Sequence, residues 1–282
     1  MTACKAEMFL ALSLLVSAAA LPAAGVQQQE MQSLRNSDFV FVGTVVETGQ
    51  ASFAGVPASA DNLVVKVDGI IEKPSAAMLS AGDEVTVRAQ DPKALPAGSR
   101  AVFYATSWIY GKGIALAEIG AQAVPQSTNS EEAVRSATAS VAQMRTQIEN
   151  DDLRARIQAA DAVVAGVVVS VQPAPAPARM VISEHNPDWQ DAIIKVSSVI
   201  KGSADLRTVA VRFPASSDVA WYGAPKLRTD QNLVLLLTQD RMSNTPPAEL
   251  NGSKLPTYTA LMPEDVLPEK QLEMVQKAAG RQ

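Results

Sequence analysis

Two stretches of the chain repeat one pattern of small, acidic and β-branched residues, and this repetition limits the fold more than any other feature of the sequence. Residues 37–46 align with residues 160–169: each has a small residue, Asp, an apolar run, Gly and further β-branched residues. Three more blocks match in the same order: 66–71 with 195–200, 85–88 with 209–212, and 101–106 with 233–238. Because only the loop lengths change between the blocks, the sequence predicts two copies of one module.

Each block is predicted to be a β-strand. The blocks are short, rich in Val and Ile, and bounded by Gly, Pro, Asp and Ser. A weaker fifth strand is expected at 113–119 in the first copy and at 257–262 in the second. Gly43 and Gly166 lie at the same point of the first strand, where glycine indicates a bulge or a tight bend. The predicted fold class is mainly β with flanking helices: two tandem five-stranded OB-like barrels, each with an N-terminal and a C-terminal helix.

A helix is predicted between the two sets of strands. Thr128 and Glu131 have the spacing of a capping box, and apolar residues follow at steps of three and four. We expect this helix to end near Asn150, where Asp151 or Asp152 can cap a second short helix. A closing helix of the second copy is expected to start at Pro268. The predicted division is therefore a signal peptide at 1–25, a first barrel module at 27–150 and a second at 151–282, each module with a closing helix.

The first residues have the order of a secretory signal peptide. Lys5 supplies a positive charge, residues 9–20 are an apolar run, and small residues precede the polar 27–29, so cleavage is expected within 20–25. The run is shorter than the ~20 apolar residues of a spanning helix, and an uncleaved membrane anchor is the alternative. Because the only cysteine, Cys4, lies ahead of the run, the mature chain has no thiol. We expect a periplasmic or secreted protein with no membrane span after cleavage.

Composition argues against several functions. The net charge of −5, the pI of about 5.1 and the aromatic content of 5% offer no general attraction to nucleic acid or anionic lipid. With His185 as the only histidine and no mature cysteine, the chain lacks the usual residues of a catalytic triad or a zinc site. We predict that the protein is not an enzyme and has no cofactor or metal. A hydrolase that uses His185 is the remaining enzymatic alternative.

Residues 160–164, which follow a lead-in helix, and Lys201-Gly202, which follow the second strand, resemble the netrin-like domain found in tissue inhibitors of metalloproteinases. The resemblance covers both copies and implies OB-type five-stranded barrels with helices at both ends, a scaffold often used for protein binding. In the inhibitors a cysteine at the mature N-terminus chelates the protease zinc. Since neither copy contains a cysteine, the resemblance does not extend to metalloprotease inhibition.

Aromatic and cationic residues gather on predicted loops, where such clusters are enriched in binding surfaces. These residues are the candidate contacts with a partner, although each aromatic ring could instead pack beneath its own loop. The candidates are Trp108, Tyr110, Lys112, His185, Trp189, Trp221, Tyr222, Lys226 and Arg228. The sequence thus predicts an exported protein that binds another protein through barrel loops, with binding of an envelope polysaccharide as the alternative.

Overall fold

The computed structural model describes residues 21–109, 113–177, 184–241 and 244–280 and divides into two units, Met1–Ile148 and Glu149–Gln282. The elements of unit 1 are α1 (Leu21–Arg35), β1 (Phe39–Thr48), β2 (Asn62–Glu72), β3 (Glu84–Arg88), η1 (Pro92–Ala94), β4 (Arg100–Ile109), β5 (Ala115–Val124) and the first part of α2 (Ser130–Ala159). Unit 2 contains the rest of α2, β6 (Ala162–Pro173), β7 (Trp189–Lys201), β8 (Thr208–Pro214), β9 (Asn232–Gln239), β10 (Glu249–Leu250), β11 (Ser253–Lys254), β12 (Thr257–Thr259), η2 (Pro263–Asp265), β13 (Val266–Pro268), η3 (Glu269–Gln271) and α3 (Leu272–Ala278).

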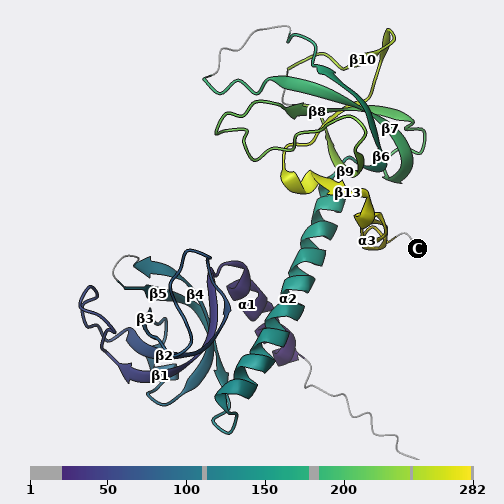
Figure 1. Cartoon of the computed structure of the whole chain (residues 1–282). Coiled ribbons are helices and arrows are strands. Elements are labelled where there is room, and N and C mark those ends of the chain that lie inside the picture. The colour runs from purple at the N-terminus through teal and green to yellow at the C-terminus, as the bar shows by residue number, and fades with distance from the viewer. Residues whose placement is uncertain (1–20, 110–112, 178–183, 242–243, 281–282) are drawn as a thin grey trace, which may run out of the picture. The chain divides into compact units, whose positions relative to one another are not determined.

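The strands of unit 1 form a closed barrel in the order β1-β2-β3-β5-β4 (Figure 1). Neighbouring strands are antiparallel except β3 and β5, which are parallel. This arrangement is the five-stranded OB-like barrel predicted from the sequence. Closure leaves no strand edge open for pairing with another chain.

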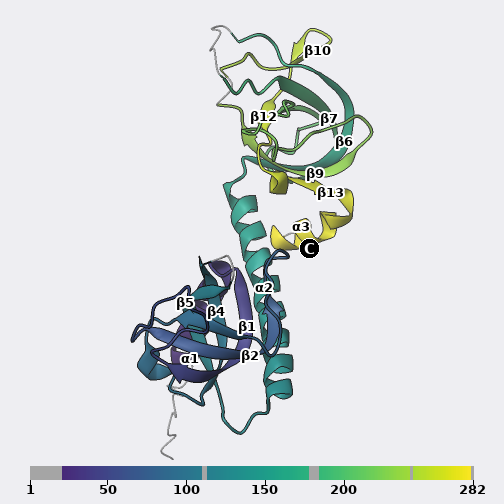
Figure 2. The same cartoon turned by 60° about the vertical axis from the view of Figure 1, so that its left-hand side comes forward.

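Unit 2 repeats this topology. Its strands follow the order β12-β8-β7-β6-β9, pairing between β12 and β9 closes the ring, and β8 and β12 are the parallel pair. Figure 2 shows β6, β7 and β9 curving around this barrel. The fifth strand is interrupted: η2 separates β12 from β13, which continues the antiparallel pairing with β9. The prediction of two tandem five-stranded barrels is confirmed.

The aligned glycines lie at matching bulges. In each copy the first strand shifts register at three corresponding places, one of them just before Gly43 and Gly166. A Cβ atom on Gly43 would come within 2.4 Å of Val65 Cγ1, and one on Gly166 within 2.5 Å of the Lys195 carbonyl oxygen. Glycine is therefore required because the second strand approaches the bulge closely, as the sequence pattern predicted.

Each unit buries apolar residues in two layers. The barrel interiors are filled by alternating strand residues such as Phe41 and Val65 in unit 1 and Val164 and Ile194 in unit 2. A second layer lies between barrel and helices. In unit 1 it joins Leu34 of α1 and the first part of α2 to β1 and β4; in unit 2 it joins the last part of α2 and Val275 of α3 to β6 and β9.

The predicted helix end near Asn150 is wrong, because α2 runs without interruption from Ser130 to Ala159. Asp151 lies inside the helix and pairs with Arg154 at 3.0 Å. No proline or glycine interrupts this stretch, and apolar residues on both sides of it are packed into a unit, so the helix continues through residues that often act as caps. At the start of α2, the Glu132 amide donates to Asn129 Oδ1 at 2.9 Å, so Asn129 takes the capping position predicted for Thr128.

Among the helices that the structure describes, none is long and apolar enough to cross a bilayer. Most of the predicted signal peptide, residues 1–20, lies outside the described residues. The predicted closing helix follows Pro268 as η3 and α3.

Candidate functional site

Two loops of unit 2 bring several of the predicted contact residues together. One joins β6 to β7 and the other joins β8 to β9. Their backbones are paired, since the Ala215 amide donates to the Asp188 carbonyl and the Ser216 amide to the Pro187 carbonyl, each at 3.0 Å. This pairing extends the β7–β8 ladder beyond the barrel and fixes the two loops to each other.

His185 and Asp218 link the loops through their side chains. His185 Nδ1 lies 2.8 Å from Asp218 Oδ1. The pKa of the Asp218 carboxyl is lowered mainly because the Ala220 amide donates to it at 2.8 Å, with a further contribution from His185. This carboxylate therefore both shapes its own loop and orients the imidazole of the other loop.

The large side chains between the loops are already engaged. The rings of Trp189 and Trp221 lie 5.7 Å apart and are tilted by 58°, and Trp221 Nε1 donates to the His185 carbonyl at 2.9 Å. Lys226 Nζ donates to the carbonyls of Pro214 and Trp221, and burial lowers the pKa of this amine. These side chains hold the β8–β9 loop in one shape and are only partly available for contact with a partner.

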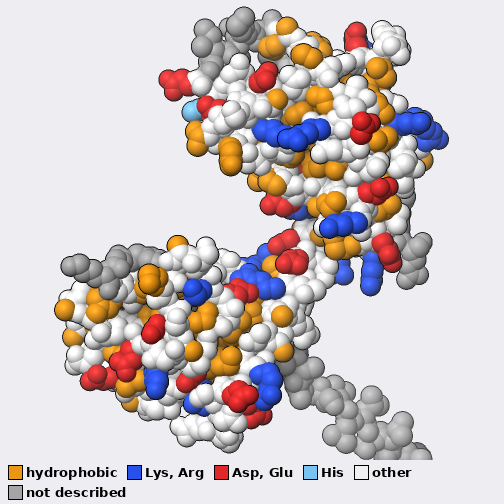
Figure 3. Space-filling view, in the orientation of Figure 1, with side chains coloured by type: hydrophobic (Ala, Val, Ile, Leu, Met, Phe, Trp, Pro, Cys, Tyr) orange, Lys and Arg blue, Asp and Glu red, His pale blue; other side chains and the backbone are white. Residues whose placement is uncertain are grey.

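Tyr222 is the predicted candidate that this loop exposes most clearly. Its side chain is 79% exposed, and Val219, which the sequence analysis missed, is 85% exposed. We call these two residues the loop tip. Arg228 is also exposed further along the loop, where its backbone amide donates to Gln231 Oε1. Figure 3 shows that hydrophobic side chains lie at the surface of unit 2 near its single histidine.

The candidates of unit 1 form no comparable cluster among the described residues. The guanidinium carbon of Arg88 lies 4.4 Å from the centre of the Trp108 ring, a cation–π contact at the end of β3 and β4. Tyr110 and Lys112 lie outside the described residues.

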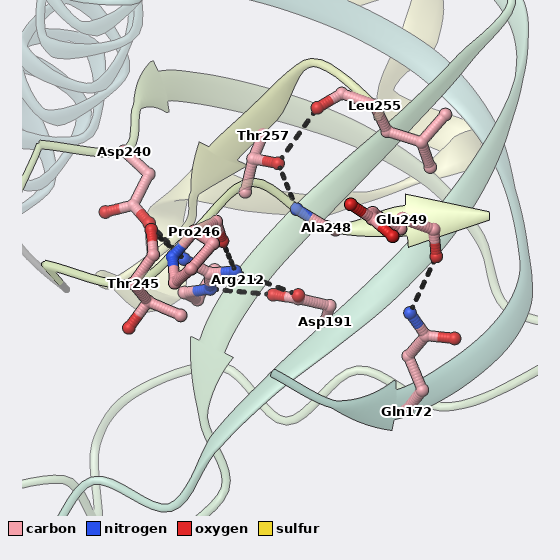
Figure 4. A network of polar contacts seen from close by, with 10 residues as sticks. All are labelled: Gln172, Asp191, Arg212, Asp240, Thr245, Pro246, Ala248, Glu249, Leu255 and Thr257. Atoms are coloured by element: carbon pink, nitrogen blue, oxygen red, sulfur yellow. Dashed lines mark hydrogen bonds and ion pairs between the residues drawn. The ribbon is translucent and has the colours of Figure 1, made fainter. Parts of the chain in front are cut away.

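A second polar arrangement, not found from the sequence, covers the outer surface of β7 and β8 (Figure 4). Arg212 is completely buried; its Nε and Nη2 donate to Asp191 at 2.8 and 2.9 Å, and its Nη1 donates to Asp240 at 2.6 Å. The same guanidinium donates to the carbonyls of Thr245 and Pro246 at 3.4 and 3.0 Å. The guanidinium of Arg212 thus links β7 and β8 to the β9–β12 connection.

The same register position in unit 1 has different chemistry. Asn62 opposes Arg88 as Asp191 opposes Arg212. Asn62 is buried; its Nδ2 donates to the Pro57 carbonyl, while its Oδ1 makes no hydrogen bond among the described residues. The two barrels have the same strand topology, but the polar residues at this register position differ.

A metal site or a catalytic site requires particular side chains that are grouped closely together. Across the described part of the chain, no three His, Cys, Asp or Glu side chains are grouped closely enough to hold a metal ion. A carboxylate on Nδ1 can orient an imidazole as a base, but that chemistry also requires a positioned nucleophile. The contacts of His185 with Asp218 and Trp221 connect the two loops.

Comparison with known proteins adds no assignment. Neither a scan against protein-family models nor a search of curated proteins finds a match for the chain. The resemblance to netrin-like domains therefore stays a prediction, and function has to be argued from the geometry of the two units.

Proposed function

We propose that the chain is an exported, non-enzymatic protein that binds another protein through the loop tip of unit 2. The observation that carries the proposal is the contrast within one loop. Trp221 and Lys226 are tied to neighbouring groups, whereas Val219 and Tyr222 are presented to solvent. An exposed tyrosine beside an exposed aliphatic side chain is typical of the contact residues of protein interfaces.

The rigidity of the loop supports the same proposal. Backbone pairing, the tryptophan contact and the Asp218–His185 contact fix the loop before any partner arrives. A preorganised loop loses less conformational entropy on binding, so two contact side chains can contribute more to affinity. A polysaccharide site would instead favour open, flat aromatic faces, and Trp189 and Trp221 are engaged with each other.

A pair of matched variants tests the loop tip. Val219→Ala with Tyr222→Ala removes the exposed apolar atoms, while Val46→Ala with Met78→Ala removes exposed apolar atoms from unit 1. A photo-crosslinking amino acid at position 222 should yield a protein adduct in the native host, and the same amino acid at position 78 should not. The loop-tip variant should reduce recovery of that partner about 10- to 100-fold, as expected when two central contact residues are truncated.

Equal crosslinking from positions 222 and 78, or unchanged recovery with the loop-tip variant, would contradict the proposal. A glycan-array signal that the loop-tip variant abolishes would favour the polysaccharide alternative. Turnover of a hydrolase substrate that His185→Ala abolishes would favour the enzymatic one.

Export rests on the N-terminal sequence pattern. N-terminal sequencing of the protein from its host should find a first residue between 21 and 26. A chain that keeps residues 1–20 in the membrane fraction would instead identify the apolar run as an anchor. Met31 and Leu34, the α1 residues that pack on the barrel, lie after the expected cleavage range and are retained in either case.

A further inference from the structure

Several side chains on the outer face of β7 and β8 point away from the barrel interior, yet they are buried. Strand alternation places Ala192 and Ile194 in the barrel interior, so Ile193 points to the opposite side. On that side Ile193 and Ala210 pack in a small cluster with Ala248, and Asp191 and Arg212 lie beside them without solvent exposure. In OB barrels the face of the second and third strands, together with neighbouring loops, binds oligonucleotides and oligosaccharides.

The covering segment is residues 244–256 of the β9–β12 connection, which we call the strap. The strap contributes its backbone carbonyls to Arg212, the completely buried Ala248 to the apolar cluster, and the Glu249 carbonyl to Gln172 at 3.2 Å (Figure 4). Leu250 and Leu255 pack against the same cluster. Residues 249–254 of the strap fold back as the β10–β11 hairpin. The face therefore contacts the strap as a binding site contacts a short folded peptide, through main-chain carbonyls and apolar side chains.

Unit 1 covers the equivalent face with a different segment. Thr86, which corresponds to Ala210, is buried beneath the β1–β2 connection, where the Ser52 amide donates to Thr86 Oγ1 at 2.8 Å. The β4–β5 connection of unit 1, which corresponds to the strap connection, comprises only residues 110–114. The barrel of unit 1 thus closes without a strap, so the strap is an addition of unit 2 to the shared fold.

We propose that the outer β7–β8 face of unit 2 is a peptide-binding site that the strap occupies within the same chain. Its ligand class is a proline-containing peptide with a small apolar residue at the position of Ala248, followed by a hairpin turn as in β10–β11. A partner with such a segment must displace the strap. This inference is independent of the proposed function, because the loop-tip substitutions lie on another connection and leave the β7–β8 face unchanged.

The first test removes the strap and supplies it as a separate peptide. Residues 241–256 are replaced by the sequence of residues 109–114, a short connection that the chain already uses in unit 1. The ends to be joined are adjacent, since the Asp240 amide donates to the Thr257 carbonyl at 3.2 Å. A fluorescent peptide of residues 244–256 should bind this variant at least about tenfold more tightly than the intact chain, where the tethered strap competes at high effective concentration.

A control peptide with Ala248→Asp should not bind, because the added carboxylate would be buried against Ile193 and Ala210. Ala248→Asp in the full chain gives a second test that keeps every residue of the face and weakens only its occupant. That variant should bind the unmodified peptide more tightly than the intact chain does.

The inference is overturned if the excised variant melts cooperatively but binds the two peptides equally. It is also overturned if full-length Ala248→Asp binds the unmodified peptide no better than the intact chain. If the excised variant does not fold, peptide binding by full-length Ala248→Asp alone tests the inference. Neither outcome depends on whether the loop tip binds a partner.

Discussion

Arg212 and Arg88 occupy the same register position in the two barrels but lie in opposite environments. Arg212 is buried between Asp191 and Asp240, whereas Arg88 is exposed over Trp108. Arg212→Met would leave two buried carboxylates without their cation, and we expect it to lower the free energy of unfolding of unit 2 by about 3–5 kcal/mol. Arg88→Met should cost less than about 1 kcal/mol. Urea unfolding of both variants checks this, and equal losses would contradict it.

Asp218 gives the loop cluster a defined pH dependence. Because its pKa in the folded chain is lowered, its contribution to stability is present above the ordinary value of 3.8 and is lost as the pH falls through the lower folded value. An NMR titration of the carboxyl carbon should place the midpoint below 3.8. His185→Ala should reduce the lowering of this pKa without abolishing it, since the Ala220 amide is its largest single cause. A midpoint that returns to 3.8 in His185→Ala would refute this order of causes.

Residue roles were the least predictable part of the site. The sequence identified Trp189, Trp221 and Tyr222 as one class of loop aromatics, but only long-range contacts determine that the tryptophans hold the loop while the tyrosine is exposed. Arg212 gave a signal that could have been used. A charged residue between the apolar Val211 and Phe213 requires a partner if it is buried, and register pairing places Asp191 opposite it.

At the scale of elements, the side chain of Lys201 caps the C-terminal end of α2. Its Nζ donates to the carbonyls of Ile157, Gln158 and Ala160 at 3.0, 2.6 and 2.6 Å, which satisfies groups that a helix end leaves without partners. We expect Lys201→Met to lower the free energy of unfolding of unit 2 by about 1–2 kcal/mol. Lys195→Met changes an exposed lysine of the same strand and should cost less than about 0.5 kcal/mol. Thermal unfolding of both variants provides the measurement; indistinguishable melting temperatures would rule out this role.

Strands were predicted better than helix ends and connections. The repeated blocks carry the β-branched runs and the glycines of the bulges, so their alignment anticipated corresponding strands and a corresponding bulge in the two barrels. The end of a helix depends on weaker local preferences, and Asn150 is tolerated inside α2 because apolar residues on both sides of it are packed. The covering segments have no periodic pattern, so the strap could not be recognised before the barrel face was known.

At the scale of the whole molecule, one barrel design occurs twice with different additions. Both units keep the strand order, the parallel pairing of the third strand with the fifth, and the bulged first strand. They differ in the β8–β9 loop that presents Val219 and Tyr222, and in the segment that covers the outer face of the second and third strands. We therefore expect the two units to have different binding properties despite their common fold.

The duplicated topology is the basis for every comparison between the two units. Inter-strand NOEs in an NMR study of the labelled chain test it most directly. The account predicts that Thr86 contacts Ala115 and that Ala210 contacts Thr257, each in parallel register. A second half without the Ala210–Thr257 contact, or with strands in a different order, would contradict it.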